Sequence, residues 1–109
     1  MPARTVSIDE IIDETMKRVL AVARPTRVIL FGSAARGEIG ANSDLDILVV
    51  VPAGTHRRRT AQAIYRNMIG LGFAVDIVVV TEDDFNRFAN HDGMVIKPAI
   101  KEGRLLYAA

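Results

Sequence analysis

Residues 27–51, RVILFGSAARGEIGANSDLDILVVV, decide how this chain folds. They contain two short apolar runs, one over residues 27–31 that ends at Gly32 and one over residues 45–51 that ends before Pro52. Apolar runs of this length, bounded by glycine and proline, predict β-strands. The loop between them therefore connects two neighbouring strand ends, where side chains from both strands can meet.

Helical patterns flank these two strands. Ser7, followed three residues later by Glu10, is a capping box, and apolar residues then recur at helical spacing as far as Pro25. Strands alternating with helices predict an α/β or α+β domain, a small sheet flanked by helices, whose strand order the sequence does not give. The other predicted elements are a helix over residues 57–71, a strand over 73–80, a helix from Thr81 toward Asn90 and a strand over 104–107.

The composition is that of one globular domain. The 109 residues are 50% hydrophobic and 25% charged, so we expect a single domain over residues 1–109. A net charge of +1 gives no overall attraction to nucleic acid, and direct nucleic-acid binding is not expected. No apolar run approaches the roughly 20 residues of a membrane helix. Without a secretory signal or any cysteine, the chain is expected to be cytoplasmic.

Two aspartates mark the start of the second strand. Asp44 and Asp46 are two residues apart, so in a strand their side chains point to the same face, with Cα atoms about 6.6–7 Å apart. Such a pair can share one magnesium ion, which prefers carboxylate oxygens. Asp44 has a simpler reading as a turn residue after Asn42 and Ser43. Asp46 lies within an apolar strand, where a carboxylate is costly without a partner or a metal.

Asp76 repeats this argument in the strand AVDIVVV. One reading is a salt bridge in the core, because aspartate is rarely buried unpaired. The other is a third carboxylate that converges on the same site from a neighbouring strand. Three carboxylates on two strands suffice to hold two magnesium ions roughly 3.5–4 Å apart. In that case we expect Asp76 to orient or deprotonate an attacking hydroxyl group.

The turn after the first strand has the features of a phosphate-binding loop. Gly32 allows a sharp turn and a close approach of backbone to a ligand, and Ser33 offers a hydroxyl and an amide N–H to a phosphate. A bare Gly-Ser pair is more often an ordinary turn, and only the ten residues that separate Ser33 from Asp44 favour the functional reading. Arg36 has two readings, a contact with phosphate or a pair with an acidic residue.

With these residues in place, GSAARGEIGANSDLDILVV resembles the signature of the minimal nucleotidyltransferases, a branch of the DNA polymerase β superfamily. AVDIVVV resembles the strand that carries that family's third carboxylate. The resemblance implies a nucleotidyltransferase fold on a mixed sheet. It also implies that Gly32, Ser33 and Arg36 bind the nucleotide, and that three carboxylates act in catalysis and bind two Mg²⁺ ions, or Mn²⁺ in their place. Those carboxylates are Asp44, Asp46 and Asp76.

Many small proteins of this family are antitoxins paired with a helical HEPN-domain protein. The resemblance therefore implies transfer of AMP from ATP to a tyrosine of a HEPN partner. Two other functions remain open: an antitoxin that neutralises its partner by binding alone, and transfer of a nucleotide to a small molecule. No further domain is expected to hold the acceptor, which favours an acceptor that is itself a protein.

Several other features are expected to be structural. The cluster Arg57–Arg59 is read as a solvated surface run in preference to a binding patch, although its charge opposes the dipole of the helix that it begins. His56 and His91 are read as surface residues. Tyr65 and Tyr107 are possible modification sites, but packing or exposure at the ends of elements explains them as well.

Overall fold

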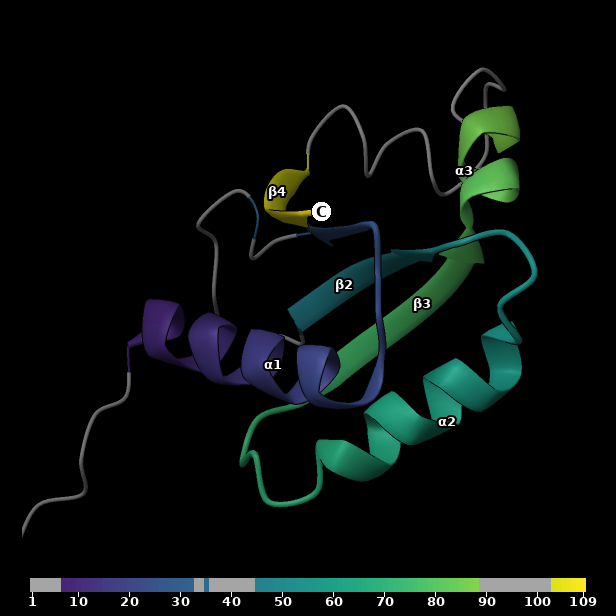
Figure 1. The fold of residues 1–109 in the computed structure, drawn as a ribbon. Helices are drawn as coiled ribbons and strands as arrows, with labels where there is room; N and C mark the ends of the chain where they lie inside the picture. Colours follow the sequence, from purple (N-terminus) through teal and green to yellow (C-terminus); the bar gives the residue numbers. More distant parts are fainter. Residues whose placement is uncertain (1–6, 33–34, 36–44, 89–102) are drawn as a thin grey trace, which may run out of the picture.

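The computed structural model describes residues 7–32, 35, 45–88 and 103–109 (Figure 1). Their helices and strands, in chain order, are α1 (Ile8–Val22), β1 (Arg27–Phe31), β2 (Leu45–Val51), α2 (Arg57–Asn67), β3 (Val75–Thr81), α3 (Glu82–Phe88) and β4 (Arg104–Ala108).

The strands form one mixed sheet in the order β3-β2-β1-β4. β1 is antiparallel to both β2 and β4, whereas β2 and β3 are parallel. A parallel pair needs a long crossover connection, and α2 supplies it between the end of β2 and the start of β3. The predicted fold class, a small mixed sheet flanked by helices, is confirmed as α+β.

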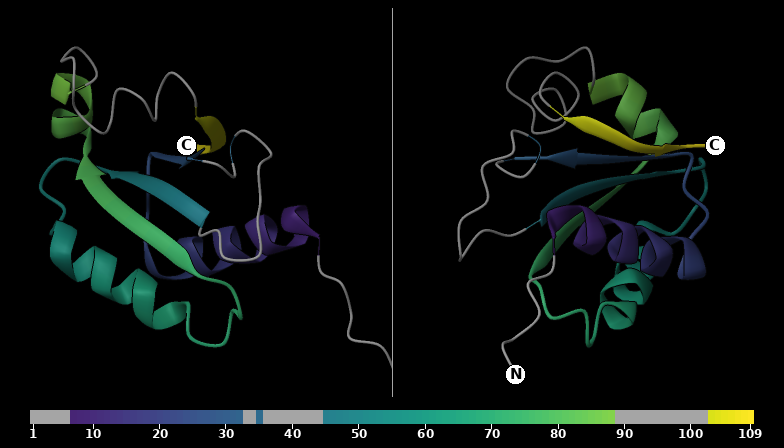
Figure 2. Two further views of the ribbon diagram at one scale, coloured as in Figure 1. Left: turned by 180° about the vertical axis from the view of Figure 1, so that it is seen from behind. Right: turned by 90° about the vertical axis from the view of Figure 1, so that its left-hand side faces the viewer.

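Helices cover both faces of this sheet. α1 and α2 lie together on one face, and α3 lies on the other (Figure 2). Because side chains alternate along a strand, β2 contributes to two cores. Leu45, Ile47 and Val49 pack toward α1 and α2, and Leu48 and Val50 pack with Phe85 of α3. This alternation decides which face each polar residue of β2 occupies.

The predicted starts of α1 and α3 are confirmed in atomic detail. The Ser7 hydroxyl accepts a hydrogen bond from the Glu10 amide at 3.2 Å, as an N-cap does. The Thr81 hydroxyl accepts in the same way from the Asp84 amide at 3.3 Å. The predicted end of α3 near Asn90 lies outside the described residues. Among the described helices none is long and apolar enough to span a bilayer.

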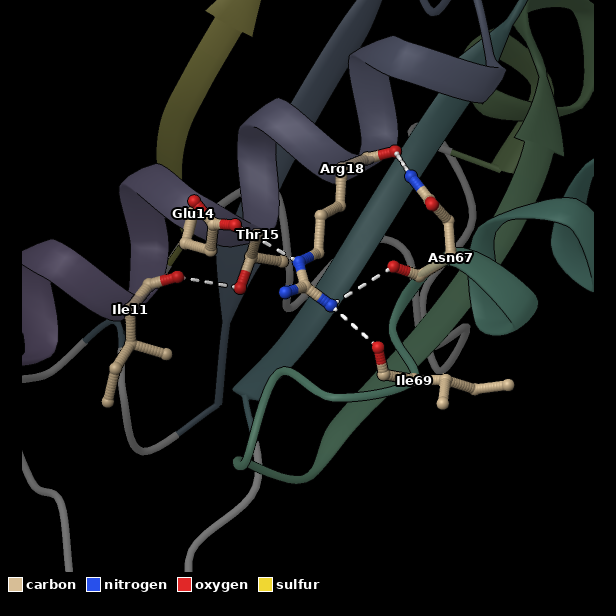
Figure 3. A network of polar contacts seen from close by, with 6 residues as sticks. All are labelled: Ile11, Glu14, Thr15, Arg18, Asn67 and Ile69. Carbon is tan, nitrogen blue, oxygen red and sulfur yellow. Dashed lines mark hydrogen bonds and ion pairs between the residues drawn. The ribbon is translucent and has the colours of Figure 1, made fainter.

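Helix α2 ends earlier than its apolar pattern predicts, at Asn67 instead of Leu71. The reason is a contact from α1, shown in Figure 3: Arg18 donates from Nη1 to the carbonyl oxygens of Asn67, at 3.3 Å, and of Ile69, at 3.0 Å. In return the Asn67 amide side chain donates to the Arg18 carbonyl at 2.8 Å. Because the last carbonyls of a helix need partners, this arginine allows α2 to stop where it does.

The bounds of two strands also differ from those predicted. β3 begins at Val75, two residues after the predicted Phe73, and continues to Thr81, one residue beyond the predicted end. Residues 73 and 74 instead lie in the connection that follows α2, in which Gly70 and Gly72 both have positive φ. β4 extends one residue beyond the predicted Tyr107.

Candidate functional site

The structure describes three of the six predicted site residues, namely Gly32, Asp46 and Asp76. Each belongs to a different strand or strand end: Gly32 follows β1, Asp46 is the second residue of β2 and Asp76 is the second residue of β3. The predicted site residues Ser33, Arg36 and Asp44 lie outside the described residues.

Asp46 and Asp76 are neighbours in the parallel ladder between β2 and β3. Paired residues of adjacent strands project to the same face, with Cα atoms about 4.8 Å apart. That face is the one opposite α1 and α2, because Leu45 and Ile47 on either side of Asp46 pack toward those helices. Asp46 is half-buried and Asp76 is exposed. The two carboxylates that the sequence placed on separate strands therefore lie side by side at the start of both strands.

Gly32 lies directly against Asp46. Its φ of +72° is in the left-handed region, which glycine adopts without strain. In the antiparallel ladder its neighbour Phe31 pairs with Asp46. A Cβ atom added at Gly32 would collide with the Asp46 carboxylate, lying 3.2 Å from Cγ and closer still to Oδ2. Only glycine lets the backbone of this turn come so close to the carboxylate.

Tyr65 of α2, for which the sequence predicted no catalytic role, lies against Asp76. Its hydroxyl lies 3.1 Å from Oδ1 of Asp76, and it accepts a hydrogen bond from the Ile77 amide at 2.8 Å. The carbonyl oxygen of Ile77 lies 3.3 Å away as a second possible acceptor. The signal that would have found it is topological: a helix between two parallel strands runs back along them, so its last turns lie near the start of the second strand.

The surroundings of Tyr65 keep its hydroxyl protonated. Partial burial raises the pKa of this phenol above its ordinary value of 10.0, and the nearby Asp76 charge and its hydrogen bond raise it further. The hydrogen bond from the Ile77 amide acts in the opposite direction. With the pKa raised on balance, Tyr65 remains a hydrogen-bond donor to the carboxylate throughout the neutral pH range.

The chemistry of the donor set fits a divalent metal ion. Asp46 and Asp76 offer carboxylate oxygens side by side, and oxygen is the ligand that Mg²⁺ prefers. Because Gly32 has no Cβ, it places no side-chain atom against the Asp46 carboxylate. Within residues 7–32, 35, 45–88 and 103–109 no group of three or more acidic or histidine side chains is placed to hold a metal. The predicted third carboxylate, Asp44, lies outside these ranges.

Comparison with known proteins now identifies the family. The family model described as "Nucleotidyltransferase domain" matches residues 8–107, nearly the whole chain. The chain belongs to this family. The resemblance noted in the sequence is thereby confirmed, and the protein is a nucleotidyltransferase. Members of this family generally use divalent metal ions.

This nucleotidyltransferase is similar to a named archaeal protein and to two solved structures. The "Putative protein adenylyltransferase MJ0604" of Methanocaldococcus jannaschii is 31% identical over 84 residues, which are 77% of this chain and 80% of that protein. A solved structure described as a "putative minimal nucleotidyltransferase" is 24% identical, with a TM-score of 0.63 over 94% of this chain and 98% of the other. A "toxin-antitoxin with AMP-PNP" is 23% identical, with a TM-score of 0.59 over 89% and 73%. At such identities the two structures show a shared fold.

The basic cluster at the start of α2 is held by contacts of its own. His56 is the N-cap, its Nδ1 accepting from the Arg59 amide at 3.2 Å. Arg57 pairs with Asp84 of α3 at 3.4 Å. Arg57 thus makes a surface contact with α3, while Arg57–Arg59 are all exposed. The reading of His56 as a plain surface residue missed its capping role. His91 lies outside the described residues.

Proposed function

We propose that this nucleotidyltransferase transfers AMP from ATP to a partner protein and acts as the antitoxin of a toxin–antitoxin pair. The observation that carries the proposal is the paired register of Asp46 and Asp76 beside Gly32. The name of the archaeal relative supports a protein as acceptor, and the similar toxin-antitoxin structure with AMP-PNP supports both an adenine nucleotide and a toxin partner. The sequence resemblance extends this to a HEPN-domain partner modified on tyrosine.

The reaction is an in-line displacement at the α-phosphorus of ATP. The acceptor hydroxyl oxygen forms a bond to the α-phosphorus, the bond from that phosphorus to the bridging oxygen breaks, and pyrophosphate leaves with the electron pair. The acceptor proton passes to a carboxylate. Catalysis of such a step rests mainly on positioning and on electrostatic stabilisation of the charge that develops.

Each residue has a role in this proposal. Asp46 and Asp76, with Asp44, would hold the divalent cations, which would supply positive charge to neutralise the triphosphate. Asp76, the more exposed of the two described carboxylates, also accepts the proton of the acceptor hydroxyl. Gly32 brings the loop backbone against Asp46, and with Ser33 and Arg36 it binds the nucleotide phosphates.

The test is label transfer with purified proteins. The protein is incubated with Mg²⁺, ATP labelled at the α-phosphate and the protein encoded by the adjacent gene. Asp46→Asn and Asp76→Asn remove one charge each with little change in shape, and each is expected to lower transfer by about 100-fold or more. Asp83→Asn is the matched control, because Asp83 is an exposed carboxylate on α3 and lies outside the paired strands.

Each outcome decides between the proposed functions. Label on the partner that disappears in the Asp46→Asn and Asp76→Asn variants, but not in Asp83→Asn, supports protein adenylylation. Transfer that survives in both site variants refutes the carboxylate assignment. Neutralisation of the partner by both variants, without any transfer by the parent protein, supports an antitoxin that acts by binding. Label on an added small-molecule hydroxyl, and not on the partner, supports the small-molecule reaction.

A further inference from the structure

The hydroxyl of Tyr65 joins the edge of the sheet to the carboxylate of Asp76. β3 is the outermost described strand on its side, so the Ile77 backbone groups that contact Tyr65 have no strand to pair with there. The hydroxyl accepts from the Ile77 amide and so has one proton left to donate. The Asp76 oxygen at 3.1 Å is nearer than the Ile77 carbonyl at 3.3 Å, and it carries charge. The proton is therefore directed mainly to the carboxylate.

Tyr65 is itself held in place from two sides. The preceding residue, Ile64, is fully buried in the core between α2 and the sheet. Two residues after Tyr65, Asn67 exchanges hydrogen bonds with Arg18 of α1, which fixes the last turn of α2 (Figure 3). A hydroxyl anchored at both the helix and the strand gives Asp76 a fixed partner, although 43% of the Tyr65 surface is exposed.

We propose that Tyr65 is a positioning residue for Asp76, an inference that rests on the proposed function. By donating to Oδ1, Tyr65 holds the Asp76 carboxylate in one orientation. This leaves Oδ2 of Asp76 to bind a divalent cation together with Asp46. The register of β2 and β3 places Asp46 beside Asp76, but it does not fix how the exposed carboxylate of Asp76 turns. Hydrogen-bond partners of metal-binding carboxylates commonly affect metal affinity or activity about 10–100-fold.

The test compares Tyr65→Phe with Tyr107→Phe. Both variants lose one phenol hydroxyl, but Tyr107 lies on β4, at the opposite side of the described sheet from β3. The measurement is the affinity for Mn²⁺ in the presence of α,β-methylene-ATP, whose α–β bridge this reaction cannot break, and in the absence of an acceptor protein. It is followed by the electron spin resonance signal of free Mn²⁺, so that no turnover is involved. We expect Mn²⁺ affinity to fall about 10–100-fold in Tyr65→Phe and to stay within about twofold in Tyr107→Phe.

A purely structural role for Tyr65 predicts another result. If its hydroxyl serves only the Ile77 backbone, then Tyr65→Phe lowers the unfolding temperature and leaves Mn²⁺ affinity unchanged. That result overturns the proposal. Circular dichroism and thermal unfolding show whether the variant is folded at the temperature of the titration. If Tyr65→Phe does not fold, Arg18→Lys is measured in its place, because it loosens the end of α2 that carries Tyr65. Mn²⁺ affinity is expected to fall in this variant, and an unchanged affinity overturns the proposal.

A double-mutant cycle assigns the effect to Asp76. In the Asp76→Asn background the added Tyr65→Phe substitution is expected to change Mn²⁺ affinity less than twofold, because the oriented carboxylate is already gone. Full additivity would refute the inference.

The Mn²⁺ and label-transfer measurements together separate the two proposals. If wild-type protein transfers label while Tyr65→Phe binds Mn²⁺ normally, only the role of Tyr65 is disproved. Wild-type protein that takes up no Mn²⁺ and transfers no label disproves the proposed function.

Discussion

Replacing Gly32 with alanine tests how closely the first turn approaches the carboxylates. At φ +72° an alanine is strained by about 1–2 kcal/mol. The new methyl group would also collide with the Asp46 carboxylate, whose Cγ lies 3.2 Å from the ideal Cβ position. Forcing additional atoms into such a contact costs about 1–3 kcal/mol. The substitution is therefore expected to lower the free energy of unfolding through two separable causes.

Gly72→Ala is the matched control, because Gly72 has a similar φ of +79° and nothing within 4 Å of its ideal Cβ position. It carries the backbone strain without the collision. Gly32→Ala should thus be less stable than Gly72→Ala by about 1–3 kcal/mol in urea unfolding. For a domain of this size, with about 4 °C per kcal/mol, the difference in unfolding temperature is about 4–12 °C.

A second substitution identifies the group responsible. Asp46→Ala removes the atoms that the new methyl group would strike, so Gly32→Ala should cost no more than Gly72→Ala when each is added to Asp46→Ala. Asp46→Asn keeps those atoms and should not relieve the collision. Equal unfolding free energies for Gly32→Ala and Gly72→Ala in the parent protein would refute the close approach, and with it the placement of the turn against Asp46.

Three further predictions concern the scaffold and Tyr65. Ser7→Ala removes the hydroxyl that caps α1 and should lower the free energy of unfolding by about 1 kcal/mol in urea titration, whereas Ser7→Asp should keep most of it. Arg18→Ala leaves the carbonyls at the end of α2 without their donor and should cost about 1–2 kcal/mol, against less than about 0.5 for the exposed Lys17→Ala on the same helix. Tyr65 has a raised pKa, so the folded protein holds this proton more tightly than the unfolded chain, and its contribution to stability is present below about pH 10 and lost as the pH rises further. Wild-type protein should lose more stability than Tyr65→Phe in urea titrations above pH 10, and parallel losses would contradict the assignment.

The parts of this fold that depend on residues close together in the sequence could be predicted. The bounds of β1 and β2 match the two apolar runs, because glycine and proline end them locally. The N-caps of α1 and α3 lie within four residues of the groups they bind. The end of α2 could not be predicted in this way, because it depends on Arg18, which comes from another helix.

In the candidate site, too, local sequence patterns predicted some features, and contacts between distant residues decided the others. Alternation along the strands and the apolar surroundings of Asp46 and Asp76 were enough to single out both carboxylates. Their pairing needed the parallel register of β2 and β3, which the sequence does not contain in any local pattern. Tyr65 was missed for the same reason: its partner Asp76 becomes a neighbour only after α2 has crossed back to the start of β3.

The register that pairs the two carboxylates is fixed by the core and not by the carboxylates themselves. Leu45, Ile47 and Val49 of β2, with Ile77 of β3, pack against α1 and α2. Sliding β3 by one residue would turn Ile77 out of this core, at a cost of roughly 1.5–3 kcal/mol for its side chain alone. The same slip would move Asp76 to the face that α1 and α2 cover. Burial of the apolar residues beside the aspartates thus holds the two carboxylates close together, against the repulsion between their like charges.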